Sequence, residues 1–519
     1  MDCAIAFTEI KKKIRVRKQK FPFRGRGLIC LNCMGIGFGH TFTEQDMQKY
    51  LIKNIQVVNE GHIKTMDLLI NKGRIERIDP SINTTAKEIN AEGKYLLPGC
   101  IDDQVHFREP GLTHKATIYT ESKAAVAGGV TSFMEMPNTI PPAFTQQLLE
   151  DKYVIAANTS LANYSFYMGT SNDNADEVLR TNEKRKEVCG IKIFMGASTG
   201  NLLVDNPNTL DKIFRGSEVL IATHCEDEKM IRENLERLKA TGRELTAADH
   251  PIIRNEDACY GSSLYAIQIA KKYGTRLHIL HISTEKELQL FTNMMPLKDK
   301  RITAEVCVHH LHFTSDDYAR LGNQIKCNPA IKSPHNKEAL WKALLDDRLD
   351  VIATDHAPHT LEEKGLMNKN GMLVALPPLE GVGGRSGYER AHAGLPLVQH
   401  PLLLMLHYYK KGKITLEKIA EKMSHAVADC FQIKERGYIR EGYHADLVII
   451  DMNQSTKVSK ENILYKCGWS PLEDMEFPAS VTHTFVNGVL VYENARPDDP
   501  FARRSVDESV KGKRLVFDR

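Results

Sequence analysis

The chain has 519 residues, of which 42% are hydrophobic and 26% are charged, which is the composition of an ordinary globular protein. Its net charge of +3 argues against a dedicated nucleic-acid-binding protein, and no stretch approaches the roughly 18 consecutive apolar residues of a membrane span. The length fits one large domain with a smaller module beside it.

The first 46 residues differ from the rest of the chain in charge. They hold nine basic and four acidic residues, a net +5 that leaves −2 for the remainder. We predict a poorly ordered, dispensable extension here, and a basic targeting arm is the alternative interpretation. Met47 opens the first segment that has the pattern of folded protein, so an internal start at Met47 is a further hypothesis.

The eleven cysteines are scattered and no secretory signal precedes them, which predicts reduced thiols in a cytoplasmic protein. Cys30 and Cys33 form a single CxxC pair. A metal or redox site would need a second pair or a strand–helix–strand context, and neither is evident around them. We therefore assign this pair no role.

Two separate segments have the pattern of short β-strands. Residues 47–98 and 436–490 alternate apolar and polar residues between turns, and Asn487-Gly488 is the signature of a tight hairpin. We predict that the two segments pair into one small β-sandwich module beside a central domain. Residues 491–519 are predicted to be a C-terminal tail.

Residues 99–435 alternate strands and helices, which predicts a parallel (β/α)8 barrel of the TIM type. One helix is predicted to end at Gly128-Gly129. Another is predicted to follow Ser283, where Thr284 and Glu287 fit a capping box. The eight candidate strands are residues 100–107, 130–137, 163–169, 190–196, 219–226, 276–283, 302–308 and 350–358.

Polar side chains gather where these candidate strands end, and in such a barrel the carboxyl ends of the strands form the mouth of the active site. Imidazoles and a carboxylate at the same end of several strands suit a divalent transition metal such as zinc. Lys192 is unusual because an unpaired ammonium is costly inside an apolar strand, so it needs a partner or a changed chemical state. The candidates are Gln104, His106, Arg108, Asn138, Lys192, His224, His281, Asp355, His356 and His359.

A set of motifs, in this order and at this spacing, resembles the dihydroorotases, which are cyclic amidases of the amidohydrolase superfamily. The resemblance covers about residues 47–490 and is specific as a set. The motifs are LLPGCIDDQVHFREPG, MPNT, GIKIFMGASTG, ATHCED, LHILHIST, EVCVHHL, NPAIK and ATDHAPH.

The resemblance implies a metal centre with one or two zinc ions. His106 and Asp355 would bind the first ion, and His224 and His281 would bind the second. Lys192 would be carbamylated, so that its new carboxylate bridges the two ions and the cost of burying an ammonium disappears.

Gln104 departs from the family pattern. Where the family has HVH, this chain has QVH, and an amide offers a metal only a neutral carbonyl oxygen. The first site is then looser, hydrated or empty, unless Gln104 is a tolerated variation that still supports two metals. A metal-poor, non-catalytic paralogue that serves as a structural partner of another pyrimidine-pathway enzyme is the corresponding alternative function.

The resemblance implies the reversible cyclisation of N-carbamoyl-L-aspartate to L-dihydroorotate and water, a step in de novo pyrimidine synthesis. In the hydrolytic direction a metal-activated hydroxide would attack the ring carbonyl, with Asp355 as the proton shuttle. Arg108 and Asn138 would hold the substrate carboxylate, helped by Asn328 and His359.

Arg108 also helps to choose among the related cyclic amidases. Hydantoins and dihydropyrimidines lack the carboxylate, so this arginine argues against an allantoinase or a dihydropyrimidinase. The simpler alternative for Arg108 is a salt bridge to its neighbour Glu109.

Three further features receive no catalytic role. Residues 360–394 are rich in glycine and charge and are either a lid or an irregular insertion. His309, His310 and His312 crowd the seventh strand, but the resemblance gives them no ligand role, so we interpret them as packing residues. The partners expected are a small-molecule substrate and, as is common in the superfamily, a second copy in a homodimer.

Overall fold

The computed structural model describes residues 48–196, 202–366, 387–494 and 505–519. The basic segment 1–46, Met47 and the Cys30/Cys33 pair lie outside the described residues, as do residues 367–386 of the segment interpreted as a lid or an insertion. In the described part, no helix combines the length and the apolar character that crossing a membrane requires.

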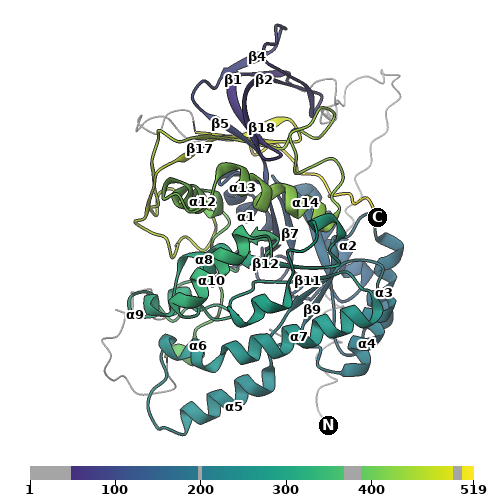
Figure 1. The fold of residues 1–519 in the computed structure, drawn as a ribbon, viewed down its shortest axis with the longest axis vertical. Helices are drawn as coiled ribbons and strands as arrows, with labels where there is room; N and C mark the ends of the chain where they lie inside the picture. The colour runs from purple at the N-terminus through teal and green to yellow at the C-terminus, as the bar shows by residue number, and fades with distance from the viewer. Residues whose placement is uncertain (1–47, 197–201, 367–386, 495–504) are drawn as a thin grey trace, which may run out of the picture. The chain divides into compact units, whose positions relative to one another are not determined.

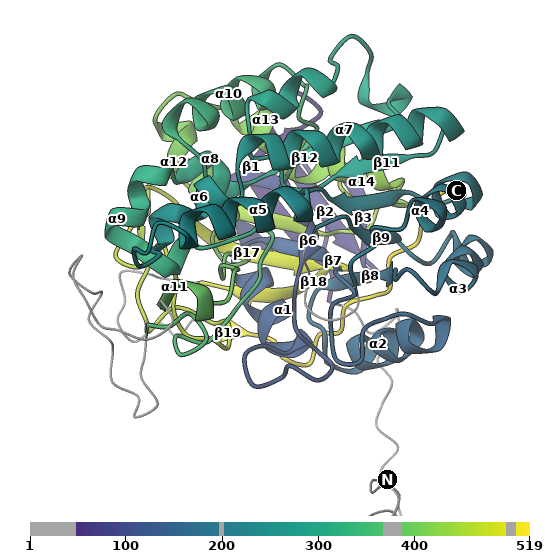
Figure 2. The same ribbon diagram turned by 90° about the horizontal axis from the view of Figure 1, so that it is seen from below.

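Eight parallel strands form the predicted barrel, and each pairs with the next along the chain. The first and last strands meet where the His106 N–H donates to the His356 carbonyl at 2.7 Å, which nearly closes the sheet. Helices surround the strands in both views (Figures 1 and 2). The strands are β6 (Cys100–Val105), β7 (Val130–Glu135), β8 (Asn163–Gly169), β9 (Gly190–Phe194), β10 (Ile221–His224), β11 (Leu277–Ile279), β12 (Ile302–Cys307) and β13 (Val351–Ala353).

Several of the helices between the strands start at side-chain caps. α1 (Ile118–Ala127) follows Thr117, whose hydroxyl accepts the Thr120 N–H, and it ends at Gly128 as predicted. The other α-helices of the described residues are α2 (Gln146–Thr159), α3 (Ala175–Leu179), α4 (Pro207–Gly216), α5 (Glu228–Lys239), α6 (His250–Ile253), α7 (Glu256–Tyr273), α8 (Val308–His312), α9 (Tyr318–Leu321), α10 (Pro334–Leu345), α11 (Gly387–Arg390), α12 (Pro401–Lys410), α13 (Leu416–Ala420) and α14 (Ala426–Phe431).

The helix predicted after Ser283 is only a short 3-10 turn, Lys286–Leu290. The predicted pair is formed, because Thr284 Oγ1 accepts the Glu287 N–H at 3.1 Å and donates to Glu287 Oε2 at 2.8 Å. The two residues therefore satisfy each other without starting an α-helix. A capping signal fixes where a turn begins but not how far it continues.

Strands from both ends of the chain form the predicted β-module as one mixed sheet, in which β5 pairs antiparallel with β14. The hairpin between β17 and β18 turns at Asn487-Gly488, with φ of 51° and 77°, as a type I′ turn requires. Figure 1 shows the purple N-terminal strands beside yellow β17 and β18. The strands are β1 (Tyr50–Asn59), β2 (His62–Asn71), β3 (Arg74–Asp79), β4 (Lys87–Asn90), β5 (Tyr95–Pro98), β14 (Leu447–Asp451), β17 (Ser480–Val486), β18 (Val489–Glu493) and β19 (Ser505–Val506).

The last residues of the chain cover the amino-terminal end of the barrel. The Leu515 N–H donates to the Tyr164 carbonyl at 2.9 Å, and the Phe517 N–H donates to the Lys186 carbonyl at 3.0 Å. The side chains of Leu515 and Phe517 are fully buried against the apolar floor of the barrel. The final residues of the segment predicted as a tail are therefore part of the core.

Candidate metal centre and active site

One cavity of about 540 Å³ opens at the carboxyl ends of the barrel strands. Parallel strands of a barrel all end at the same face, so side chains far apart in the sequence meet there. All ten residues to which the sequence assigned a metal, catalytic or substrate role line this cavity: Gln104, His106, Arg108, Asn138, Lys192, His224, His281, Asn328, Asp355 and His359.

His356, a further candidate by its position, does not line the cavity. Its Nε2 lies 2.7 Å from Glu121 Oε2, and its Nδ1 accepts the Leu397 N–H at 2.9 Å. Both ring nitrogens are therefore used to hold the barrel wall together. His356 lies three residues after the end of β13 and directly follows Asp355, but only Asp355 faces the cavity.

His224 and His281 face each other across the cavity, with His224 Nδ1 3.0 Å from His281 Nε2. Two nitrogen ligands of one tetrahedral zinc lie about 3.3 Å apart when each bond is about 2.05 Å. On the far side of the ring, His224 Nε2 lies 3.0 Å from the buried Glu226 carboxylate. That carboxylate favours a proton on Nε2, which leaves the Nδ1 lone pair pointing into the cavity.

Lys192 on β9 is 1% exposed, and its Nζ lies over the Phe194 ring, 4.5 Å from the centroid. Among the described residues no hydrogen-bond acceptor or carboxylate pairs with this amine. Burial lowers the pKa of Lys192 to about 7. A large fraction of the amine is therefore neutral near pH 7, which is the form that reacts with carbon dioxide.

His106 and Gln104 both contact Asp355. His106 Nε2 and Gln104 Nε2 each lie 3.1 Å from Asp355 Oδ1, and His106 Nδ1 lies 2.7 Å from Asn138 Oδ1. Burial lowers the pKa of His106, so the ring is neutral and carries one proton. With that proton donated to Asn138, the Nε2 lone pair faces a carboxylate oxygen, and a cation between the two would satisfy both.

The donor set therefore fits a metal centre. One group of ligands in the cavity consists of nitrogens, from Lys192, His224 and His281. The other group consists of His106 and Asp355. Gln104 is the weak point, because its amide N–H already donates to Asp355 and only the carbonyl oxygen remains for a metal.

Three residues of this site have left-handed backbone conformations. The φ angles are 69° at Arg108, 40° at His281 and 48° at Asp355. Non-glycine residues rarely adopt such angles, and they cluster at functional sites where the surrounding fold enforces them. Each lies at or just beyond the end of a barrel strand, and the turned backbone aims its side chain into the cavity.

Part of the cavity wall is cationic. Arg108 is 6% exposed; it donates from Nε to the Pro358 carbonyl at 3.3 Å, and its Nη2 lies 3.1 Å from His359 Nε2. Burial lowers the pKa of Arg108 to about 10, so the guanidinium stays charged at neutral pH. No described carboxylate forms an ion pair with it, and Glu109 instead accepts the Ile118 N–H.

Several residues of the site carried no signal in the sequence. Lys115 Nζ lies 3.1 Å from both His359 Nδ1 and Glu363 Oε1, and all three residues line the cavity. Arg254 forms a buried ion pair with Glu226, the carboxylate behind His224. Burial opposes ionisation of Glu226, but Arg254 and His224 outweigh it and lower the pKa of Glu226 to about 2. These contacts join distant parts of the chain, so no local spacing announces them.

The described part of segment 360–394, for which a lid and an irregular insertion are the two interpretations, forms part of the cavity wall. Lys364 Nζ is fully buried and donates at 3.0 Å to the carbonyls of Lys326, His392 and Gly394. His392 and Gly394 line the cavity beside Glu363. A lysine that binds three carbonyls fixes this part of the wall.

Residues 95–491 match the model of the amidohydrolase family. The chain belongs to that family. It is 32% identical over 454 residues to a dihydroorotase of Carboxydothermus hydrogenoformans, with 85% of this chain and 98% of the relative covered. It is also 29% identical over 459 residues to an allantoinase of Desulfitobacterium hafniense, with 86% and 96% covered.

Solved structures show the same architecture. The L-hydantoinase of Arthrobacter aurescens superposes with a TM-score of 0.78 at 25% identity, over 87% of this chain and 97% of that one. The amidohydrolase family and these relatives make the chain a hydrolase that acts on cyclic amides.

Proposed function

We propose that this amidohydrolase is a zinc-dependent dihydroorotase, which interconverts N-carbamoyl-L-aspartate and L-dihydroorotate in pyrimidine synthesis. The observation that carries the proposal is Arg108, a buried guanidinium that faces the cavity without a carboxylate partner among the described residues. A buried charge is costly unless it is paired, and the carboxylate of the substrate supplies the missing partner.

The substrate carboxylate would lie against Arg108 and Asn138, with His359 and Asn328 at the edge of the same wall. A guanidinium fork binds a carboxylate at two points and so fixes the plane of the ring. Arg108 is itself held by the Pro358 carbonyl and His359, so little side-chain entropy is lost when the substrate binds.

Zinc ions held by His106, Lys192, His224, His281 and Asp355 would polarise the reacting carbonyl and lower the pKa of water towards about 7. Lys192 would hold them through a carbamate, formed when the neutral amine attacks carbon dioxide and loses a proton. The new N–C bond turns a buried cation into an anion suited to metal ions, which removes the desolvation penalty of the ammonium.

Asp355 would move the proton. Its Oδ1 lies between His106 and Gln104, and its left-handed backbone aims the carboxylate into the cavity. In hydrolysis the carboxylate takes the proton of the attacking water and gives it to the leaving ring nitrogen. In ring closure the carbamoyl nitrogen bonds to the side-chain carboxyl carbon, the C–O bond breaks, and water leaves.

Two other functions keep specific support. The allantoinase relative favours another cyclic amidase, and the Gln104 amide bound to Asp355 favours a metal-poor structural paralogue. The cationic wall favours the dihydroorotase because allantoin and the dihydropyrimidines carry no carboxylate for Arg108.

A substrate panel with the full chain tests the proposal. The protein, supplied with zinc and bicarbonate, is assayed with L-dihydroorotate, N-carbamoyl-L-aspartate, allantoin and dihydrouracil, and metal per chain is measured on the same sample. We expect turnover with the first two compounds only. Faster turnover of allantoin or dihydrouracil would replace the proposal with another cyclic amidase. Absence of metal and of all turnover would replace it with the structural paralogue.

A further inference from the structure

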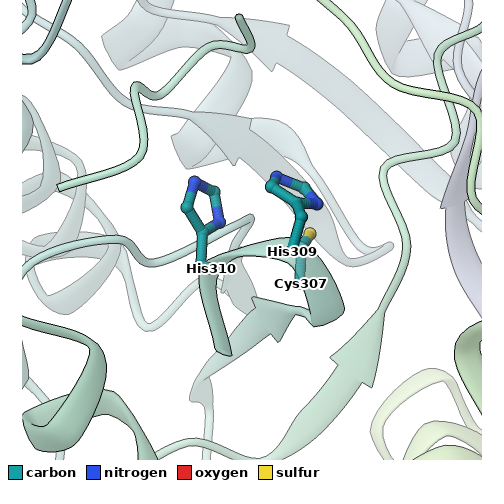
Figure 3. A group of neighbouring side chains, drawn as sticks. All are labelled: Cys307, His309 and His310. Atoms are coloured by element: carbon teal, nitrogen blue, oxygen red, sulfur yellow. The ribbon is translucent and has the colours of Figure 1, made fainter. Parts of the chain in front are cut away.

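A second group of potential ligands lies behind the wall of the active-site cavity. Cys307 is the last residue of β12, and His309 and His310 belong to α8, which follows directly. Figure 3 shows the two imidazoles side by side, with the Cys307 sulfur close to the His309 ring. All three side chains are buried, at 3% exposure or less.

The imidazoles of this cluster lack the hydrogen bonds that buried histidines normally make. Nδ1 of His310 has no hydrogen-bond partner among the described residues, and the ring of His309, which has the Thr354 backbone near it, makes no hydrogen bond of good geometry there. Buried polar atoms in folded proteins are nearly always well paired, so poorly paired imidazole nitrogens gathered in one place need a reason. An ion that the nitrogens coordinate is such a reason.

His310 is already oriented as a metal ligand. Its Nε2 lies 3.2 Å from the Pro329 carbonyl, which can only accept, so Nε2 carries the proton. The unpaired Nδ1 therefore presents its lone pair. Metal-bound histidines commonly donate their other N–H to a backbone carbonyl in this way.

The ligand atoms lie close together. Sγ of Cys307, one nitrogen of His309 and one nitrogen of His310 are all within 4.8 Å of one another. A thiolate with two imidazoles is a borderline-soft donor set that suits zinc or cobalt and excludes magnesium and calcium.

We propose that Cys307, His309 and His310 bind a zinc-type divalent ion at a site distinct from the catalytic metal centre. The site lies next to the cavity, because Cys307 Sγ lies 3.8 Å from Oε1 of Gln104, which lines the cavity. Binding replaces the S–H proton, so each ion releases one proton. The proposal stands independently of the proposed function, since none of the three residues belongs to the ligand set of the catalytic centre.

Cobalt substitution tests the site without an activity assay. The metal-stripped full chain is titrated with Co²⁺, and absorption is recorded in the near ultraviolet and the visible. A thiolate bound to cobalt gives a charge-transfer band in the near ultraviolet that nitrogen and oxygen ligands do not give, so the catalytic centre is silent there. We expect this band in the difference spectrum of wild type minus Cys307→Ser, together with one fewer cobalt bound per chain in the variant.

The difference spectrum cancels the contribution of every other thiol, including Cys30 and Cys33. Cys189→Ser, a buried cysteine of the barrel floor, is the matched control and should keep the full band. His310→Gln keeps the thiol and should weaken cobalt binding at this site by roughly 10-fold or more. A difference spectrum without the band, in variants whose thermal melting matches wild type, would overturn the proposal. So would equal cobalt content in wild type and in both ligand variants, because the cluster would then be only a packed histidine pair.

Discussion

At the scale of single residues, the cavity is defined by two buried basic side chains that form no ion pair with any described carboxylate. Arg108 and Lys192 are both nearly inaccessible to solvent, and neither forms an ion pair within the described part of the chain. Burial shifts the pKa of each downward, to about 10 for Arg108 and about 7 for Lys192. The first therefore stays a cation that attracts an anion, while the second becomes an amine that can react.

Asp355→Asn tests the proton shuttle. An amide cannot take and return a proton, so we expect kcat to fall by about 10²–10⁴ while the fold is kept. Steady-state kinetics in both directions, with metal content measured on the same protein, give the comparison. Near-normal turnover in a folded, metal-loaded variant would remove Asp355 from this role.

Arg108→Met tests the recognition of the carboxylate. Methionine fills similar space but offers no charged donor, and a charged hydrogen-bonded contact contributes about 1.5–3 kcal/mol. We expect KM for N-carbamoyl-L-aspartate to rise by roughly 10- to 150-fold. Arg108→Lys keeps the charge but loses the two-point fork, so its KM should lie between those of wild type and Arg108→Met. An unchanged KM in Arg108→Met would contradict the assignment of dihydroorotate as substrate.

The low pKa of Lys192 predicts how activation depends on pH. Only the neutral amine forms a carbamate, so reactivation of metal-free protein by zinc at constant dissolved carbon dioxide should accelerate as pH rises through about 7 and level off above it. An unperturbed lysine would place that rise near pH 10.4. Lys192→Gln should show no such activation. A rise located near pH 10 would mean that the amine is more exposed to water than the structure shows.

At the scale of the elements, the ends of helices are set by what lies next to them. α1 ends at Gly128, where an added Cβ would come within 2.4 Å of the Gln399 carbonyl oxygen. Gly261 lies in the middle of α7, and a Cβ there would meet nothing within 4 Å. Packing therefore requires glycine at the end of α1, whereas the middle of α7 has room for a larger side chain.

This contrast gives a paired prediction for stability. Gly128→Ala should lower the free energy of unfolding by about 1–3 kcal/mol, because backbone must move to admit the methyl group. Gly261→Ala should raise it by roughly 0.5–1 kcal/mol, because alanine is the better helix former at an open position. Urea denaturation of the two variants and wild type measures both. Equal effects of the same sign would show that packing at Gly128 does not decide its identity.

At the scale of the whole molecule, the two ends of the chain complete the structure around the barrel. The N-terminal strand β5 pairs with the C-terminal β14, and the final residues seal the barrel floor. Active-site residues lie at the opposite end of the strands, so the two ends of the barrel serve stability and chemistry separately.

The C-terminal segment should therefore matter for stability. Phe517 is 1% exposed and Val516, next to it, is 47% exposed. Phe517→Ala should cost about 3–5 kcal/mol, because it removes a buried ring and leaves a cavity, whereas Val516→Ala should cost less than about 0.5 kcal/mol. Thermal melting of the two variants provides the measurement. A small loss in both would mean that the segment is not part of the cooperative core.

The sequence by itself determined the local elements and the residues that face the site. Strand and helix periodicity located all eight barrel strands, the Gly128 helix end and the Asn487-Gly488 turn, because these depend on neighbours a few residues away. The parallel order of the strands then placed His224, His281 and Asp355 at one end. Local sequence patterns are enough to predict these features because the barrel repeats the same strand–helix unit.

Only the tertiary structure decided what these residues contact. Contacts between distant residues could not be predicted from local spacing. Examples are the Lys115–Glu363 pair, 248 positions apart, and the buried Arg254–Glu226 pair, 28 positions apart. Another is the packing of Phe517, at the end of the chain, into the barrel floor. The same holds for the poorly paired nitrogens of His309, which look like ordinary packing in the sequence. Whether a buried polar atom has a partner depends on the whole surrounding shell, and no linear spacing encodes that shell.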